Sequence, residues 1–222
     1  MKIEQILALC DHTILAPTAT WEQVRGVIDE GITYSTASVC IPPDYVSRAA
    51  KYAAGRVKIC TVIGFPNGYS TSEVKVYEAA CAVRDGAGEI DMVINIGMLK
   101  DGRYSEILDE INLIKSRIGD RVLKVIIEAC LLTEEEKLRI CDIVADSAAD
   151  FIKTSTGFST SGATAADVKL LSDRMAGRKR VKAAGGIKSL SDAEEFISLG
   201  AARLGTSRLV SIAKSERAKS DY

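Results

Sequence analysis

Short apolar or β-branched segments alternate with helical patterns along all 222 residues, and this alternation restricts the fold more than any other feature. Strand alternating with helix implies right-handed crossovers and a parallel sheet. Eight segments qualify as strands, and they lie at residues 9–12, 34–39, 57–63, 89–95, 122–128, 151–154, 180–183 and 202–205. Such a series predicts an α/β protein with a single (β/α)8 barrel of the TIM type over residues 1–222, and a doubly wound sheet is the alternative.

Capping signals mark the expected helix ends between these segments. The spacing of a capping box, Ser or Thr followed three residues later by Gln or Glu, occurs at Thr20, Ser70, Thr133 and Ser191. Glycines stand where helical patterns stop, at Gly31, Gly86 and Gly200. The segment from about 214 to 222 is polar and lacks apolar periodicity, so we predict a loosely structured C-terminal tail there.

Charge and cysteine usage restrict the class of protein. The 29 basic residues nearly cancel the 30 acidic ones, and no long run of like charge occurs, so neither a nucleic-acid nor a membrane partner is expected. Six cysteines are scattered without a CxxC pair, and His12 is the single histidine. This pattern argues against a histidine-based zinc site or a Ser-His triad. We expect a reduced, cytoplasmic protein that uses no metal and no cofactor.

Two lysines and one aspartate carry the chemistry that the sequence predicts. Lys153 follows an apolar pair in a short strand, and Lys182 lies in the next strand. An amine that is shielded from water and close to a second cation loses its proton more readily and becomes a nucleophile. Asp91 faces inward by strand alternation, and we expect it to pair with a lysine and relay protons. The alternative is that all three form salt bridges that only stabilise the barrel.

A phosphate site is predicted from backbone rather than from charge. Gly185 and Gly186 follow the seventh strand, and Gly205 and Ser207 follow the eighth. Phosphates in such barrels bind at these two loops, where glycine lets backbone N–H groups approach the anion. Gly157, after the sixth strand, offers a further N–H group. Each of these motifs is weak alone, but their placement after neighbouring strands strengthens the prediction.

Other residues near the strand ends are weaker candidates. Asp11 and Cys40 are candidate substrate contacts, although a buried thiol commonly has only a structural role. His12 is either catalytic or a core histidine. Lys124 and Glu128 share a face of the fifth strand, and we expect them to form an ion pair near the site.

Eight sequence blocks, in order over residues 11–208, resemble the deoxyribose-phosphate aldolase family. They are DHTIL, ASVC, TVIGFPNG, GAGEIDMVINIG, LKVIIEA, ADFIKTSTGF, VKAAGGI and RLGTS. The resemblance implies a (β/α)8 barrel that reversibly cleaves 2-deoxy-D-ribose 5-phosphate to D-glyceraldehyde 3-phosphate and acetaldehyde. It also implies that Lys153 forms the Schiff base and that Lys182 and Asp91 transfer protons. Some members end in a tyrosine that shuttles protons, which makes Tyr222 a candidate.

The chain departs from the family pattern in several loops. These departures are Ala16, Pro42, Phe158 and the pair Ser159 and Thr160, and Phe158 removes a cation that some members carry beside KTSTG. None of them affects the two lysines or the aspartate. Two alternatives stay open: another Schiff-base phosphosugar lyase or a phosphosugar isomerase on the same barrel, and a non-catalytic phosphosugar-binding module. We expect a homodimer or a higher homo-oligomer.

Overall fold

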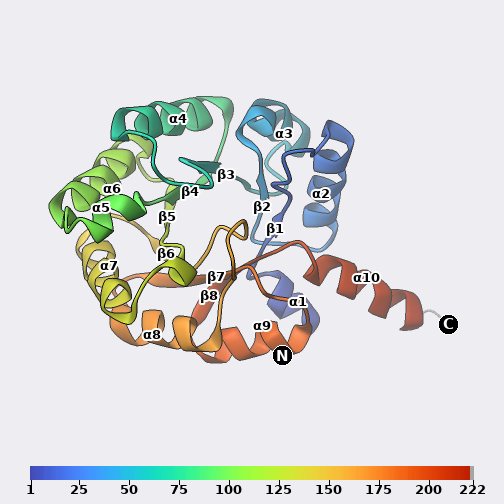
Figure 1. The fold of residues 1–222 in the computed structure, drawn as a ribbon. Helices are drawn as coiled ribbons and strands as arrows, with labels where there is room; N and C mark the ends of the chain where they lie inside the picture. The colour runs from blue at the N-terminus through green and yellow to red at the C-terminus, as the bar shows by residue number, and fades with distance from the viewer. Residues whose placement is uncertain (221–222) are drawn as a thin grey trace.

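The computed structural model describes residues 1–220, with side chains described as far as residue 216. Eight parallel strands hydrogen-bond in the order β1 to β8 and close into a barrel (Figure 1). The strands are β1 (Cys10–Thr13), β2 (Ser38–Ile41), β3 (Ile59–Ile63), β4 (Glu89–Val93), β5 (Val122–Ile126), β6 (Phe151–Lys153), β7 (Arg180–Ala184) and β8 (Ala201–Thr206). The predicted barrel is therefore confirmed, and the doubly wound alternative is wrong.

Helices surround the barrel, as Figure 1 shows. The α-helices are α1 (Ile3–Leu7), α2 (Trp21–Thr33), α3 (Val46–Ala53), α4 (Ser72–Asp85), α5 (Ile96–Lys100), α6 (Tyr104–Ile118), α7 (Glu134–Asp146), α8 (Ala165–Met175), α9 (Leu190–Ser198) and α10 (Leu209–Ser220). Two 3-10 turns, η1 (Pro43–Tyr45) and η2 (Ala129–Leu131), follow β2 and β5. No helix within residues 1–220 is both long enough and apolar enough to cross a membrane.

Some predicted helix ends are confirmed and others are wrong. Thr20 and Thr133 form the predicted capping boxes of α2 and α7. The boxes predicted at Ser70 and Ser191 do not form, because α4 begins after Thr71 and α9 is capped by Ser189 with Asp192.

The glycines behave differently from one another. Gly86, with a φ of 106°, and Gly200, with a φ of 103°, follow α4 and α9 as predicted. Gly31 does not end its helix but lies inside α2. A Cβ atom there would meet Val39 Cγ1 at 2.4 Å, so this glycine allows α2 to pack closely on β2.

Five predicted strands, the second to the sixth, are longer than the observed ones, and the second and the fifth show why. The second begins at Ser38 rather than at residue 34, because α2 runs to Thr33 and Ser35 turns the chain with a φ of 50°. The fifth ends at Ile126, and Glu128 lies beyond it with a φ of 50°. A positive φ is costly for residues other than glycine, so both positions are fixed by their surroundings.

Alternation along the strands separates an apolar outer face from a polar interior. On β4, Ile90 and Met92 belong to the large apolar cluster between barrel and helices, whereas Glu89 and Asp91 are the buried charged residues. Because both faces of a parallel barrel are covered, charged side chains on the inner face must find partners inside the barrel. This requirement determines the geometry of the site.

The C-terminal segment is helical where the sequence predicted loose structure. Helix α10 continues to Ser220, and Leu209, Val210 and Ala213 are buried in a cluster that also contains Ile6 and Leu7 of α1. Three apolar residues near the start of the helix are therefore enough to dock it. Tyr222, the candidate proton shuttle, lies outside the described residues.

Candidate active site

A cavity of about 310 Å³ opens at the carboxyl ends of the strands. Its lining contains six of the residues predicted from sequence: Lys153, Gly157, Gly185, Gly186, Gly205 and Ser207. The other lining residues are Thr13, Leu15, Thr156, Phe158, Ala184, Ile187, Lys188, Thr206 and Arg208. The structure thus brings the predicted nucleophile and the predicted phosphate loops together around one cavity.

Lys153, Lys182 and Asp91 meet at the bottom of this cavity. Lys153 ends β6, is only 3% exposed, and donates from Nζ to Asp91 Oδ2 at 2.8 Å. Lys182 is its register partner on β7 and donates to the same oxygen at 2.7 Å. The predicted proximity of the two lysines is therefore confirmed, but the two ammonium groups do not simply repel each other, because a carboxylate oxygen is shared between them.

Lys124 on β5 is a fourth member that the sequence interpretation placed wrongly. Its Nζ lies 2.8 Å from Asp91 Oδ1 and 2.7 Å from Glu89 Oε2. The predicted ion pair between Lys124 and Glu128 does not form. Glu128 lies past the end of β5 and instead accepts hydrogen bonds from the backbone N–H of Thr156, at 3.2 Å, and from its hydroxyl. The signal that identifies Lys124 is its position beside Asp91 on the neighbouring strand.

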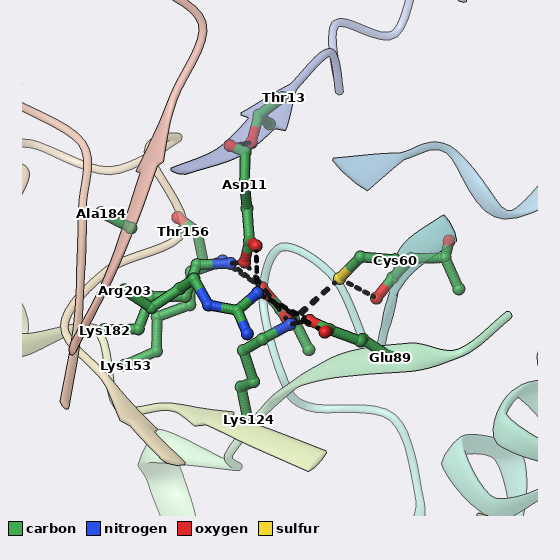
Figure 2. Close-up of polar contacts among 12 residues, drawn as sticks. Asp11, Thr13, Cys60, Glu89, Lys124, Lys153, Thr156, Lys182, Ala184 and Arg203 are labelled. Carbon is green, nitrogen blue, oxygen red and sulfur yellow. Dashed lines mark hydrogen bonds and ion pairs between the residues drawn. The ribbon is translucent and has the colours of Figure 1, made fainter. Parts of the chain in front are cut away.

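Asp11 and Arg203 complete the buried network. Asp11 contacts Lys182 and accepts from Arg203 Nη1 at 2.6 Å, and the same guanidinium lies 3.1 Å from Glu89. Figure 2 shows the side chains of Lys124, Lys153, Lys182 and Arg203 converging from different strands. Of these four cations, Lys153 alone is among the residues that line the cavity.

Positive charges outnumber negative charges in this network. Four cations (Lys124, Lys153, Lys182 and Arg203) share three carboxylates (Asp11, Glu89 and Asp91) among the described side chains. The network therefore carries an excess of one positive charge. Lys153 is the member that faces the cavity, so it is the lysine that a substrate can reach.

The pKa shifts follow from these contacts. Burial raises the pKa of Asp91, but the ammonium groups of Lys124, Lys153 and Lys182 outweigh it and hold that pKa well below its ordinary value. Burial lowers the pKa of Lys182, but Asp11 and Asp91 outweigh it, so the pKa is raised and this lysine stays protonated. Opposed shifts of this kind place an ionised acid beside a permanent ammonium group.

Two groups of buried side chains have ligand atoms close enough together for a metal ion. These are Cys40, Cys60 and Asp91, and Asp11, Cys60 and Glu89. Their carboxylate oxygens already accept hydrogen bonds from the lysines and from Arg203, so a metal ion would have to displace those cations. The donor set therefore fits an internal ion-pair network better than a metal centre.

The anion-binding side of the cavity is built largely from glycine backbone. Gly185 and Gly186 have φ values of 73° and 78°, in a region that L side chains rarely adopt. Gly162, in the loop after β6, packs against them so closely that a Cβ atom there would lie 2.4 Å from the carbonyl carbon of Gly185. Lys188 and Arg208 add two cations to this side. The sequence interpretation missed both, although Arg208 directly follows Ser207 and Lys188 is two residues after Gly186.

Part of the cavity lining is apolar. Leu15 and Phe158 belong to it, and the Phe158 ring makes an edge-to-face contact with Phe65, with centroids 5.3 Å apart. Phe65 also packs with Leu15 in a small cluster. The position at which some family members carry a cation is therefore part of an aromatic wall in this chain.

Asp11 and Cys40 do not line the cavity, in contrast to their prediction as substrate contacts. Asp11 is fully buried beneath it by Lys182 and Arg203, and Cys40 is 1% exposed and packs with Cys60. His12 points out of the barrel, with Nε2 at 2.6 Å from Glu30 Oε2, away from the chemistry. These three side chains support the site from below or from outside.

The fold and the site together define a class of protein. A closed barrel of parallel strands, with a buried lysine opening into a cavity beside backbone loops after strands seven and eight, is the arrangement of barrel enzymes that act on small phosphorylated substrates. The family follows from comparison: the family model described as "DeoC/LacD family aldolase" matches residues 5–208. The chain belongs to this family and is an aldolase, which is a lyase.

Similar proteins support this assignment. The deoxyribose-phosphate aldolase of Streptococcus pyogenes serotype M12 (strain MGAS2096) is 52% identical over 221 residues, which cover 100% of this chain and 99% of the relative. A putative deoxyribose-phosphate aldolase from Coccidioides immitis has a similar solved structure, with a TM-score of 0.94, 38% identity and coverage of 98% of this chain and 87% of that chain. The deoxyribose phosphate aldolase of Aeropyrum pernix, described as tetrameric, has a TM-score of 0.87 at 34% identity, covering 97% and 92% of the two chains.

Proposed function

We propose that this chain reversibly cleaves 2-deoxy-D-ribose 5-phosphate to D-glyceraldehyde 3-phosphate and acetaldehyde through a Schiff base on Lys153. The observation that carries the proposal is that Lys153 lines the cavity while its ammonium group shares Asp91 with two further lysines. The curated relative that is 52% identical carries the same activity in its name. An isomerase or a binding module on this barrel has no need of such an amine.

The reaction begins when the neutral amine of Lys153 attacks C1 of the open-chain sugar. Loss of water gives an iminium ion, which is an electron sink. The C2–C3 bond then breaks, its electron pair moves toward the iminium nitrogen, and the C3 hydroxyl loses its proton as C3 becomes the aldehyde of glyceraldehyde 3-phosphate. The enamine that remains is protonated at C2 and hydrolysed, which releases acetaldehyde and restores the amine.

Asp91 and Lys182 move the protons in this scheme. Asp91 Oδ2 lies within 2.8 Å of Lys153 Nζ and within 2.7 Å of Lys182 Nζ, so a proton can pass between the lysines over one carboxylate oxygen. The raised pKa of Lys182, to which Asp11 and Asp91 contribute against the effect of burial, makes it a reservoir of protons rather than a second nucleophile.

The substrate phosphate binds at the glycine side of the cavity. The N–H groups of Gly157, Gly185 and Gly186 and the loop of Gly205 and Ser207 surround this end of the cavity, and positive φ values let backbone approach an anion closely. This places C1 of a five-carbon sugar at the lysine end.

Assembly and location are part of the same proposal. We place the enzyme in the cytoplasm as a single-domain protein that forms homo-oligomers. All six cysteines are free, as is usual in a reducing compartment. A relative that is 34% identical is described as tetrameric.

Borohydride reduction in the presence of acetaldehyde tests the proposal. Intact-mass analysis of the native chain is expected to show one added two-carbon unit, and peptide mapping is expected to place it on Lys153. Lys153→Arg keeps the charge and is expected to abolish both the adduct and turnover. An adduct on another peptide, or turnover by Lys153→Arg, overturns the assignment. A phosphosugar isomerase retains no two-carbon unit, and a binding module binds substrate without turnover.

A further inference from the structure

His12, the single histidine, takes part in a hydrogen-bonded bridge with Glu30 and Lys214 that lies outside the active site. His12 is 3% exposed and faces the helices, and its Nε2 lies 2.6 Å from Glu30 Oε2 on α2. Burial raises the pKa of Glu30, but hydrogen bonds from Lys214 and His12 outweigh it and lower the pKa. The carboxylate is therefore ionised and only accepts hydrogen bonds, so His12 Nε2 carries the hydrogen.

The same carboxylate reaches the C-terminal helix. Lys214 of α10 donates from Nζ to Glu30 Oε1, so one side chain joins β1 to α10. The side chains of Glu30 and Lys214 are 27% and 48% exposed, which makes this an ionic bridge at the surface rather than part of the core.

Helix α10 is continuous with the anion-binding side of the cavity. Ile212 N donates to the Arg208 carbonyl at 3.1 Å, so Arg208 belongs to the first turn of the helix. Arg208 N donates to Thr206 Oγ1 at 3.0 Å, and Thr206 is the register partner of His12. A shift of α10 therefore moves a segment that lines the cavity, while the bridge holds the helix to the strand beside that segment.

We propose that Glu30 is a positioning residue for phosphate binding, which acts by fixing α10 and with it residues 205–208. This inference rests on the proposed function for the identity of the substrate. Loss of Glu30 releases α10 and therefore weakens recognition of the phosphate by residues 205–208. Because Glu30 does not line the cavity, the chemistry at Lys153 stays unchanged.

Kinetics with a phosphorylated and an unphosphorylated substrate distinguish a role of Glu30 in phosphate binding from a general structural role. In Glu30→Ala, we expect the KM for 2-deoxyribose 5-phosphate and the inhibition constant of inorganic phosphate to rise by about threefold to fivefold, as for the loss of a half-exposed ionic bridge. The value of kcat, and the rate with unphosphorylated 2-deoxyribose, are expected to stay within about twofold of native. Lys214→Met, at an exposed position, is expected to repeat the effect, and Lys214→Arg to restore native values.

Glu22→Ala is the matched control, because Glu22 lies on the same helix and pairs only at the surface with Arg25. Unchanged phosphate affinity in both Glu30→Ala and Lys214→Met overturns the inference, as does an equal loss for both substrates. Phosphate affinity is also measured by thermal shift with inorganic phosphate alone. If the native chain binds phosphate but does not cleave the sugar, the proposed function fails while Glu30 is still tested. A native chain that does not bind phosphate overturns both.

Discussion

Replacing Lys124 by methionine tests whether excess positive charge in the barrel activates the site. The substitution keeps the length of the side chain and leaves three cations for three carboxylates. Lys124 and Lys153 each lie 2.8 Å from a different oxygen of Asp91. Their nitrogen atoms are therefore roughly 6 Å apart, and at an effective dielectric constant of about 20 two unit charges at that distance repel by about 3 kcal/mol.

That repulsion corresponds to about two pH units, and rearrangement of Asp91 reduces it. With one cation fewer, a positive charge on the nitrogen of Lys153 meets less repulsion. The acidic limb of the profile of kcat/KM against pH is expected to move toward alkaline pH by about one to two units. Activity at pH 7 is expected to fall by about tenfold or more for the same reason.

Stability changes as well, because Asp91 and Glu89 lose a buried partner. Such losses cost about 3–5 kcal/mol, which for a chain of this size lowers Tm by about 6–20 °C. Circular dichroism confirms folding at the assay temperature, and Lys124→Arg, which keeps the charge, is the control. A folded Lys124→Met variant with the native pH profile refutes the reasoning.

Three further predictions follow from the same structure. Gly186→Ala, at a φ of 78°, is expected to raise the KM for the phosphorylated sugar. Gly177→Ala is the control: it has a similar φ of 80° but open space around it, so it is expected to lower stability only. Steady-state kinetics measure the KM, and thermal melts measure the stability. Glu128→Gln replaces a charged acceptor of the hydrogen bonds from Thr156 by a neutral amide, which weakens them. The free energy of unfolding in urea is therefore expected to fall by about 1.5–3 kcal/mol, and an unchanged urea midpoint contradicts this role. Burial outweighs the hydrogen bond that His12 donates to Glu30 and lowers the pKa of His12 from 6.5, so the unfolded chain takes up a proton first as the pH falls. The stability of the native chain relative to His12→Asn is therefore expected to decline below pH 6.5, and parallel pH curves of the two chains would contradict this.

The fold was predictable because local patterns repeat along the chain. Each strand is short, apolar and followed by a helical pattern, so the number and order of units are visible without knowledge of contacts. Boundaries were harder to predict where tertiary packing decides them. Gly31 has the sequence signature of a helix end, yet it lies inside α2 because β2 packs against it. Polar residues from Lys214 onward suggested a tail, yet α10 continues to Ser220, and apolar residues upstream of Lys214 bury the start of the helix.

In the site, too, some features were predictable from local sequence patterns and others depend on tertiary packing. The convergence of Lys153, Lys182 and Asp91 was predictable because each occupies an inward position on its strand. The partners of Lys124 were not predicted. Parity along one strand suggested Glu128, whereas Glu128 lies past the end of β5 and Asp91 is the register partner of Lys124 on β4. Lys188 and Arg208 were missed because an exposed cation after a glycine loop has no distinctive pattern.

The contact between Gly162 and the pair Gly185 and Gly186 bears on how specificity can change. Here two loops stack backbone on backbone, and a Cβ atom on Gly162 would lie 2.6 Å from the nitrogen of Gly186. A surface made of main-chain atoms cannot be retuned by exchanging side chains. Selection or engineering for a different acceptor aldehyde must therefore work on side chains of the cavity lining such as Leu15 and Phe158, where a substitution alters the shape of the cavity.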